Sequence, residues 1–519
     1  MNEQIIDPLK KYFINPAYII KPDKTRAIIT NAKGFDIFYP RGDENTSISW
    51  LLNPVYAVIF TFFDGTHTLK DTIARISREL GIVEVKVLSM LKPYINNSKA
   101  QMIHYKKEHV DPQFPMLENA FHIPKYFLIE NSDNKPRTDL FPKECFYIRR
   151  ELWDFENFRL SSPICITLML NNKCVTDCIY CYANKKHVVQ NSLTTEKILA
   201  LIKEANDLGV LIFDISGGEV LLHKDCNVIL SELYKNGYTP YVSIKKPLTE
   251  KQIIKLKETG LTKIQISIDA WDTSILTKLL GVNKEYFRRL KSTLHFLEKH
   301  SIDVSIKSVI TRYNCNIDTV KLLLSNLIKF KNISRITIAP GEYSLYKGVK
   351  GFLDYRLSME QWDVLADFVN TFSKDLDIPI NVQGITNKIG IIDNVDVKAT
   401  SFQKRGLCSG NTTSLYILPD GQVTICEELY WSHRFIVGDI KTQSIQEIWE
   451  SEKALNLYNF SQKDIRNTSA CKYCPDFIQC HSKLGVCWKM IYQAYGMESW
   501  DLPDPRCPLA PPPENEFYR

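Results

Sequence analysis

Three cysteines, Cys174, Cys178 and Cys181, lie within eight residues and constrain this chain more than any other feature. They follow a run of apolar and β-branched residues, 164–170, that ends in two asparagines. Such a pattern predicts a β-strand that delivers a loop to its carboxyl end, where α/β folds hold their reactive groups. The loop offers three soft ligands and no fourth, so we expect a metal centre with an odd number of protein ligands.

Strand-like and helix-like segments alternate from residue 161 to about residue 340. Such alternation implies a parallel sheet, and right-handed crossovers curl six units of this kind into an open barrel. We predict strands at 164–170, 211–215, 239–244, 263–268, 303–310 and 335–339. We predict helices at 193–207, 225–237, 249–259, 283–300 and 316–329. The expected fold class is α/β, with a partial (β/α)6 TIM barrel whose strand ends line one mouth.

The spacing of the three cysteines distinguishes between a structural zinc site and an iron–sulfur cluster. Structural zinc prefers four ligands, and this C-x₃-C-x₂-C trio has no nearby fourth thiol or imidazole. A four-iron cluster held by three thiolates leaves one iron open to a small molecule. The trio, with Tyr180 before its last cysteine, resembles the signature of the radical S-adenosylmethionine (radical SAM) superfamily. The resemblance implies a 4Fe–4S cluster on Cys174, Cys178 and Cys181, which binds S-adenosylmethionine and cleaves it to a 5′-deoxyadenosyl radical.

Polar residues also end the second and fourth predicted strands. Two glycines after a strand permit close backbone approach, and a neighbouring carboxylate suits an ammonium group. In register with the cysteines, Gly217, Gly218 and Glu219 resemble the family motif that holds the amino group of the methionine. Ser267 and Asp269 share one face of the fourth strand, and the resemblance places them near the ribose and carboxylate. The alternatives are a plain tight turn and a satisfied core serine.

Two positions depart from the family pattern. The third strand of relatives often ends in Thr-Asn-Gly, and this chain has Ser243-Ile-Lys245-Lys246-Pro instead. Ser243 takes over hydrogen bonding there, and Lys245 adds a charge for the substrate or the methionine carboxylate. Many relatives carry an arginine shortly after the fourth strand, where this chain has Lys278. Arg312, just past the fifth strand, is the alternative partner of that carboxylate.

Seven further cysteines lie between residues 408 and 507, in a stretch with little apolar periodicity. Such a stretch is stabilised by metal more than by a core, and a zinc ribbon would need a second C-x₂-C pair. The segments G-x₄-C and C-x₂-C-x₅-C resemble the SPASM extension, although six residues precede Cys487 where the family usually has three. The resemblance implies two auxiliary iron–sulfur clusters, one on Cys408, Cys426 and Cys487 and one on Cys471, Cys474, Cys480 and Cys507. The three-thiol cluster has either an open iron for a substrate thiolate, a non-cysteine ligand, or a smaller form.

The first 105 residues form a small separate domain in this interpretation. Two extended segments around Pro22-Asp23-Lys24 predict a hairpin, and three short helices follow, at 54–63, after the cap Thr68, and near 83–95. This pattern is winged-helix-like, and residues 53–80 resemble the leader-peptide recognition element of ribosomal-peptide maturation systems. That element adds an extended peptide to its sheet edge. The alternatives are a DNA-binding helix-turn-helix, which the sparse basic residues disfavour, and a purely structural domain.

Composition narrows the cellular setting. The net charge of +6 is only mildly basic, so we expect no nucleic-acid partner, and no apolar run approaches the ~20 residues of a membrane span. With neither a signal peptide nor an anchor motif, the chain is expected to be cytoplasmic. Its 14 cysteines are then not a disulfide framework. Four of them are interpreted as small buried hydrophobic side chains: Cys145, Cys165, Cys226 and Cys315.

Together these patterns predict five parts and one class of enzyme. The parts are a leader-recognition domain (1–105), a connector (106–160), a radical SAM barrel (161–340), a bridging region (341–405) and a SPASM domain (406–519). The resemblance implies a maturase that modifies a ribosomal precursor peptide, with an electron donor such as flavodoxin or ferredoxin. We expect Cys thioether crosslinks, as in sactipeptides or ranthipeptides. Carbon–carbon crosslinking, epimerisation, formylglycine formation and metal-dependent DNA-binding regulation are the alternatives.

Overall fold

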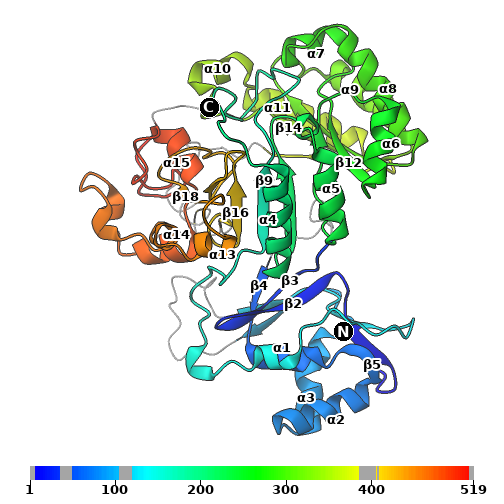
Figure 1. The fold of residues 1–519 in the computed structure, drawn as a ribbon, viewed down its shortest axis with the longest axis vertical. Coiled ribbons are helices and arrows are strands. Elements are labelled where there is room, and N and C mark those ends of the chain that lie inside the picture. The colour runs from blue at the N-terminus through cyan, green and yellow to red at the C-terminus, as the bar shows by residue number, and fades with distance from the viewer. Residues whose placement is uncertain are drawn as a thin grey trace. The chain divides into compact units, whose positions relative to one another are not determined.

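The computed structural model describes residues 6–34, 49–104, 120–384, 402, 405 and 408–513. It divides the chain into two compact units, Met1–Ser162 and Pro163–Arg519, coloured from blue to cyan and from cyan to red in Figure 1. Residues 120–162, most of which we had expected to form a connector, belong to the first unit. Inside the second unit, the boundaries at residues 340 and 405 stay predictions.

In its described residues, the first unit combines three small antiparallel sheets with three α-helices. One sheet has the order β5-β1-β8, another β2-β3-β4, and β6 pairs with β7. The strands are β1 (Lys11–Ile14), β2 (Tyr18–Asp23), β3 (Arg26–Asn31), β4 (Ser49–Leu52), β5 (Asp64–Thr68), β6 (Gln101–His104), β7 (Ala120–Ile123) and β8 (Leu128–Glu130). The helices are α1 (Pro54–Thr61), α2 (Leu69–Leu80) and α3 (Glu84–Leu91).

Local sequence signals account for most of these elements. The predicted hairpin is confirmed, because β2 and β3 pair from Tyr18↔Asn31 to Asp23↔Arg26. The cap Thr68 is also confirmed, since its side chain accepts from the backbone N–H of Asp71 at 3.2 Å. The helix predicted over 54–63 ends earlier, at Thr61, and strand β5 begins at Asp64. That strand pairs with β1, a partner that local signals do not reveal.

The second unit contains the predicted parallel strands and helices. Its strands are β9 (Cys165–Met169), β10 (Ile212–Ser216), β11 (Ser243–Ile244), β12 (Lys263–Ser267), β13 (Asp303–Ile310), β14 (Ile333–Pro340), β15 (Ile380–Val382), β16 (Ser414–Ile417), β17 (Gln422–Thr424) and β18 (Ile436–Asp439). Its helices are α4 (Thr195–Asp207), α5 (Cys226–Lys235), α6 (Glu250–Glu258), α7 (Thr273–Leu280), α8 (Glu285–Lys299), α9 (Ile317–Leu327), α10 (Gly348–Tyr355), α11 (Met359–Phe372), α13 (Ile445–Trp449), α14 (Glu452–Tyr458) and α15 (Trp488–Tyr495). Helix α7 was not predicted, and neither were helices α10, α13, α14 and α15.

The barrel strands form two sheets where we had expected one continuous sheet. Their orders are β10-β9-β16-β17-β18 and β11-β12-β13-β14-β15, and strands β9 to β15 pair in parallel within them. The ladder breaks between β10 and β11, where β11 is only two residues long. Pro240 and Pro247, which cannot donate to a ladder, lie three residues before and three residues after it. At the break, the Asp214 side chain accepts from the Tyr241 N–H at 2.9 Å.

One large apolar core holds the second unit together. It runs from Ile166 on β9 through Ile266 on β12 and Ile306 on β13 to Trp449 on α13, all at most 1% exposed. The core therefore includes residues from both the barrel strands and the cysteine-rich segment. Among the helices of the described residues, none is long and apolar enough to cross a membrane.

Candidate active site

The loop with the three cysteines leaves β9 and is held in place by helix α7. The backbone N–H groups of Asp177 and Ile179 donate to the last carbonyls of that helix, Leu280 and Leu279, at 2.7 and 3.0 Å. These carbonyls have no partner within the helix, so the loop satisfies them. Helix α7, which the sequence analysis missed, therefore positions the cysteine loop.

The structure brings Cys174 and Cys178 together around one hydroxyl. The Thr176 Oγ1 atom lies 3.3 Å from the Sγ atoms of both cysteines. Burial raises the pKa of the Cys181 thiol, and negative charge on Cys178 and Cys174 adds to that rise. Within the described part of the chain, no group of three or more His, Cys, Asp or Glu side chains is arranged to hold a metal ion. Thiolate sites commonly close only when the metal binds, so the donor set fits an iron–sulfur cluster.

The two glycines after β10 allow their turn to pack against the cysteine loop. A Cβ atom on Gly218 would lie 2.1 Å from the Lys173 carbonyl oxygen, and one on Gly217 would lie 2.6 Å from that of Asn171. The Gly218 N–H donates to the Asn171 carbonyl at 2.8 Å, and the Glu219 N–H donates to that of Lys173 at 2.7 Å. The observed role of this motif is thus to support the loop, and its contact with methionine stays a prediction.

The buried carboxylate of Glu219 holds the end of β11, and the residue as a whole is 1% exposed. Its Oε2 atom accepts from the backbone N–H groups of Lys245 and Lys246, both at 2.9 Å. Its Oε1 atom accepts from the Leu221 N–H at 3.3 Å. Burial raises the pKa of Glu219, and these three N–H groups oppose the rise. Glu219 therefore links the second strand to the third beside the cysteine loop.

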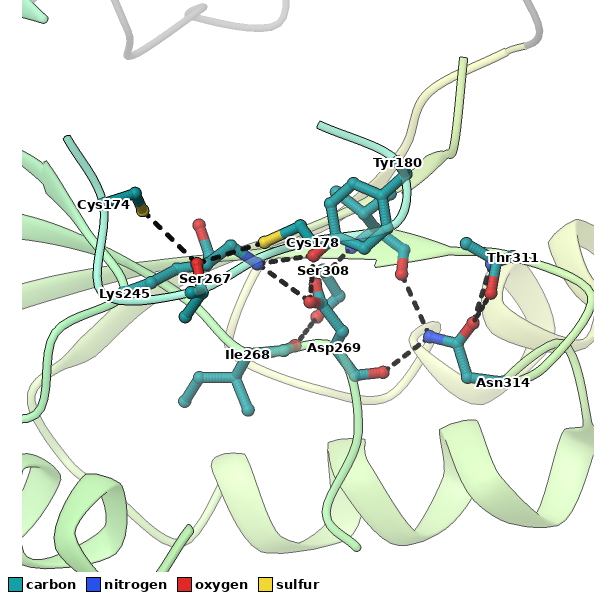
Figure 2. Close-up of polar contacts among 12 residues, drawn as sticks. Cys174, Cys178, Tyr180, Lys245, Ser267, Ile268, Asp269, Ser308, Thr311 and Asn314 are labelled. Atoms are coloured by element: carbon teal, nitrogen blue, oxygen red, sulfur yellow. Dashed lines mark hydrogen bonds and ion pairs between the residues drawn. The ribbon is translucent and has the colours of Figure 1, made fainter. Parts of the chain in front are cut away.

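Lys245, Asp269 and Tyr180 form a buried polar network (Figure 2). The Lys245 Nζ atom donates to Asp269 Oδ2 at 2.8 Å and to the Tyr180 hydroxyl at 2.5 Å. The Tyr180 hydroxyl in turn donates to Asp269 Oδ2. The other oxygen, Oδ1, accepts from the Val309 N–H at 2.9 Å, and the Asp269 carbonyl accepts from Asn314 at 2.7 Å. The network joins the cysteine loop to the third, fourth and fifth strands.

Ser243 and Ser267 meet at a residue that the sequence analysis did not single out, Gln265. Ser243 and Tyr241 donate to Gln265 Oε1 at 2.7 and 3.0 Å, and Gln265 Nε2 donates to Ser267 Oγ at 3.0 Å. Gln265 is 4% exposed on β12. A glutamine in an otherwise apolar strand was the available signal. The predicted contacts of both serines with S-adenosylmethionine stay predictions.

Arg312 and Lys278 gather around Tyr313 instead of the Lys245 network. The Lys278 Nζ lies 3.7 Å from the ring centre of Tyr313, and the Arg312 guanidinium lies 5.8 Å from it. Arg312 is exposed. Lys245 is thus the basic residue of these three that the structure places next to Tyr180 and Asp269.

The C-terminal thiols interact electrostatically in two sets. Burial raises the pKa of Cys471 to about 12, and charge on Cys480, Cys507 and Cys474 contributes. Burial likewise raises the pKa of Cys426 to about 12 and that of Cys487 to about 11, and both thiols interact with Cys408. These interactions agree with the two ligand sets, which themselves stay predictions. Of the four scattered cysteines, Cys226 is buried, but Cys145 is exposed and was wrongly interpreted as a buried side chain.

Strand pairing joins the cysteine-rich segment to the barrel. Strand β16, which begins six residues after Cys408, pairs in parallel with β9 from Ser414↔Cys165 to Ile417↔Leu168. A side-chain hydrogen bond makes a second link: the hydroxyl of Tyr182, which follows Cys181, donates to Oε2 of Glu427, which follows Cys426, at 3.4 Å. The sequence analysis missed both links, because the local sequence around each residue does not indicate which distant segment it contacts.

Comparisons with known proteins agree with this geometry. Residues 168–323 match the model of the radical SAM superfamily, and residues 408–475 match that of SPASM, an iron–sulfur cluster-binding domain. This chain combines a radical SAM domain with a SPASM domain. The radical SAM domain implies a 4Fe–4S cluster and S-adenosylmethionine, and the SPASM domain implies auxiliary iron–sulfur clusters.

Two relatives illustrate the similarity. Fe-coproporphyrin III synthase of Methanosarcina barkeri is 23% identical over 344 residues, which cover 62% of this chain and 83% of that protein. The crystal structure of Streptococcus suis SuiB bound to the precursor peptide SuiA matches with a TM-score of 0.61 at 14% identity, over 95% of this chain and 98% of that one. SuiB bound to S-adenosylmethionine matches with a TM-score of 0.60 at 13% identity. The SuiB comparison therefore shows that the two proteins share a fold along nearly their whole length.

Proposed function

We propose that this chain is a radical SAM maturase that forms Cys thioether crosslinks in a ribosomally made precursor peptide. The observation that carries the proposal is the shared fold with SuiB over 95% of this chain, because that match includes the N-terminal unit as well as the two iron–sulfur domains. SuiB has been crystallised with a precursor peptide. A radical SAM core by itself would support many reactions, whereas this combination of parts favours a peptide substrate.

The N-terminal unit offers surfaces that suit a peptide better than DNA. Strands β5 and β8 are the edges of one sheet and β2 and β4 those of another, and edge strands present N–H and C=O groups to an extended chain. Helix α3 exposes Val85 by 81% and Leu88 by 39%, and Val83 before it by 69%. Apolar side chains on that helix suit the side chains of a leader peptide and add nothing to phosphate binding.

The cluster and S-adenosylmethionine would supply a 5′-deoxyadenosyl radical that takes a hydrogen atom from a carbon of the peptide. In this proposal Cys174, Cys178 and Cys181 hold the cluster, and Gly217 and Gly218 let the next turn support their loop. The carboxylate of Glu219 keeps the end of β11 in position. These residues orient the reactive centre, and none of them is proposed to exchange a proton with the peptide.

Thioether formation is favoured by the group of three thiols, Cys408, Cys426 and Cys487. A four-iron cluster on three thiolates has an open iron, which would bind a cysteine thiolate of the peptide and hold its sulfur. The auxiliary cluster would also accept the surplus electron when sulfur bonds to carbon. Carbon–carbon crosslinking and epimerisation need no such sulfur position.

Product mass after co-expression with a Cys-rich peptide encoded beside the gene tests the proposal. A thioether removes two hydrogens, so each crosslink lowers the mass by about 2 Da and protects one cysteine from alkylation by iodoacetamide. The control is the same co-expression with Cys174, Cys178 and Cys181 all changed to Ala, which leaves the peptide unmodified. An unchanged mass with deuterium uptake from the solvent would indicate epimerisation and contradict the proposal. A lower mass with every cysteine still alkylated would indicate a carbon–carbon crosslink.

A further inference from the structure

Hydrogen bonds to the backbone of Lys245 hold this residue in place, independently of the contacts of its side chain. Its N–H donates to Glu219 Oε2 at 2.9 Å, and its carbonyl accepts from the Tyr286 hydroxyl at 2.7 Å. Tyr286 and Glu219 are 7% and 1% exposed, so both anchors are buried. Two fixed hydrogen bonds on one residue restrict the directions that its side chain can take.

The ammonium group of Lys245 is then paired inside the protein. Its partner Asp269 has a side chain that is 0% exposed, and the Lys245 side chain is 15% exposed. Asp269 Oδ1 is also held by the Val309 N–H at 2.9 Å, so the carboxylate is fixed from two sides. The Nζ atom lies 5.1 Å from the ring centre of Tyr180, the residue before Cys181. Desolvated pairs of this kind are screened far less by salt and water than surface pairs.

The same ammonium group lies beside the cysteine loop, because it contacts Tyr180, which lies between Cys178 and Cys181 in the chain. Burial lowers the pKa of Lys245, but Asp269 and the charges on Cys178 and Cys174 raise it above the ordinary value, so the lysine stays charged. Lys185 is another cation near the loop, and its Nζ donates to the Thr176 carbonyl at 2.7 Å. However, Lys185 pairs with Asp177, whose side chain is 76% exposed. Solvent therefore screens the electrostatic effect of the Lys185 charge.

We propose that Lys245, positioned by Asp269, is an electrostatic partner of the radical SAM cluster and raises the reduction potential of that cluster. This inference rests on the proposed ligands Cys174, Cys178 and Cys181. Reduction transfers one electron from an external donor to the cluster and adds one negative charge. A fixed positive charge nearby stabilises the reduced form more than the oxidised form, and the net charge around a cluster is one of the factors that set its potential. Lys245 is a positioning and tuning residue in this view, and its effect does not depend on S-adenosylmethionine.

The test measures the midpoint potential of the radical SAM cluster in the full-length, anaerobically reconstituted protein without S-adenosylmethionine. Dithionite and redox mediators set the potential, and EPR reports the reduced cluster. Cysteine-to-alanine changes at the seven C-terminal positions isolate the signal of the first cluster. We expect Lys245→Met to shift the midpoint to more negative values. Asp269→Asn keeps the hydrogen-bond acceptor for Val309 but removes the opposing negative charge, so we expect a shift to more positive values.

Two further variants control the experiment. Lys246→Met removes the same charge one residue along, where Nζ donates to the Leu221 carbonyl at 3.4 Å, and its midpoint is expected to equal that of the parent protein. Lys245→Arg keeps the charge and is expected to restore the parent potential. If Lys245→Met loses its cluster, the opposite shift in Asp269→Asn still tests the proposal.

Some outcomes would overturn the inference. An unchanged midpoint in Lys245→Met with full iron content contradicts it, and so does an equal shift in Lys246→Met. An unchanged midpoint together with weaker binding of S-adenosylmethionine would assign Lys245 to the methionine carboxylate instead. Failure of the ligand assignment is distinguishable, because Cys174→Ala would then keep the EPR signal of the parent cluster.

Discussion

At the scale of single residues, close backbone contacts decide where the cysteine loop lies. Gly218 is the sharpest case, because a Cβ atom there would lie 2.1 Å from the Lys173 carbonyl oxygen and 2.6 Å from the Lys173 carbonyl carbon. Both obstacles are backbone atoms of the strand-to-loop segment that leads to Cys174. A side chain at position 218 would therefore displace either the cysteine loop or the turn after β10.

We expect Gly218→Ala to reduce the occupancy of the radical SAM cluster. Overpacking of this kind costs about 1–3 kcal/mol, and here the strain falls on the loop that carries the ligands. The measurement is the iron content and EPR signal of a protein that also lacks the seven C-terminal cysteines. The matched control is Gly384→Ala, because no atom lies within 4 Å of a Cβ built at that glycine. Equal cluster occupancy in both variants would contradict the role of Gly218.

At the scale of secondary-structure elements, helix α3 has an exposed apolar surface that the fold of its own unit does not cover. Its inward residues Val87 and Leu91 are 1% and 0% exposed, whereas Val85 is 81% exposed. A short helix with apolar residues on both sides is predicted poorly from periodicity, because the pattern does not say which face is inside. The structure resolves that question by burying Val87 and Leu91 and leaving Val85 exposed.

We expect Val85→Glu to weaken binding of the leader peptide at least tenfold and leave the thermal stability of the protein nearly unchanged. The valine is exposed, so the substitution loses little packing within the protein, but it places a charge where the peptide would bury apolar groups. Fluorescence anisotropy with a labelled leader peptide measures the Kd. Leu9→Glu is the control, since Leu9 is 73% exposed elsewhere in the same unit. Unaltered Kd in Val85→Glu would place the leader on another surface.

At the scale of the whole molecule, the large core of the second unit extends from the barrel strands into the cysteine-rich segment, whose residues 465–495 also form much smaller clusters. Among the described residues, one small cluster of buried side chains consists of Ile465, Cys471 and Phe477, and a second is built around Val486, Ile491, Ala494 and Tyr495. The regular elements between residues 460 and 487 are helical turns of three to six residues. Such a segment depends on its metal for stability more than the barrel does.

We expect chelation of the auxiliary clusters to unfold this segment while the barrel strands stay folded. Hydrogen–deuterium exchange followed by mass spectrometry, with and without iron, is the measurement. Amide protection is expected to fall over residues 460–487 and to persist over β12 and β13, whose side chains belong to the large core. Protection that is the same with and without iron over residues 460–487 would show that packing alone maintains this segment.

Much of the fold and part of the site follow from local sequence patterns. Cysteine spacing, the alternation of strands and helices, and the cap Thr68 are properties of neighbouring residues, and chain geometry converts them directly into loops, strands and helix starts. The radical SAM and SPASM domains were recognisable for this reason, since their ligands are grouped along the chain. The same patterns identified Gly217, Gly218 and Glu219 beside a strand end.

Only the tertiary structure decided which distant segments meet. The pairing of β9 with β16, the break between β10 and β11, and the support of the cysteine loop by α7 depend on packing of segments far apart in the chain. Lys245 is the clearest case: its sequence context showed only an added charge, and the fold placed that charge on Asp269 and Tyr180. The physical reason is that periodicity constrains which face of an element is apolar, whereas the partner of a polar side chain depends on the path of the whole chain.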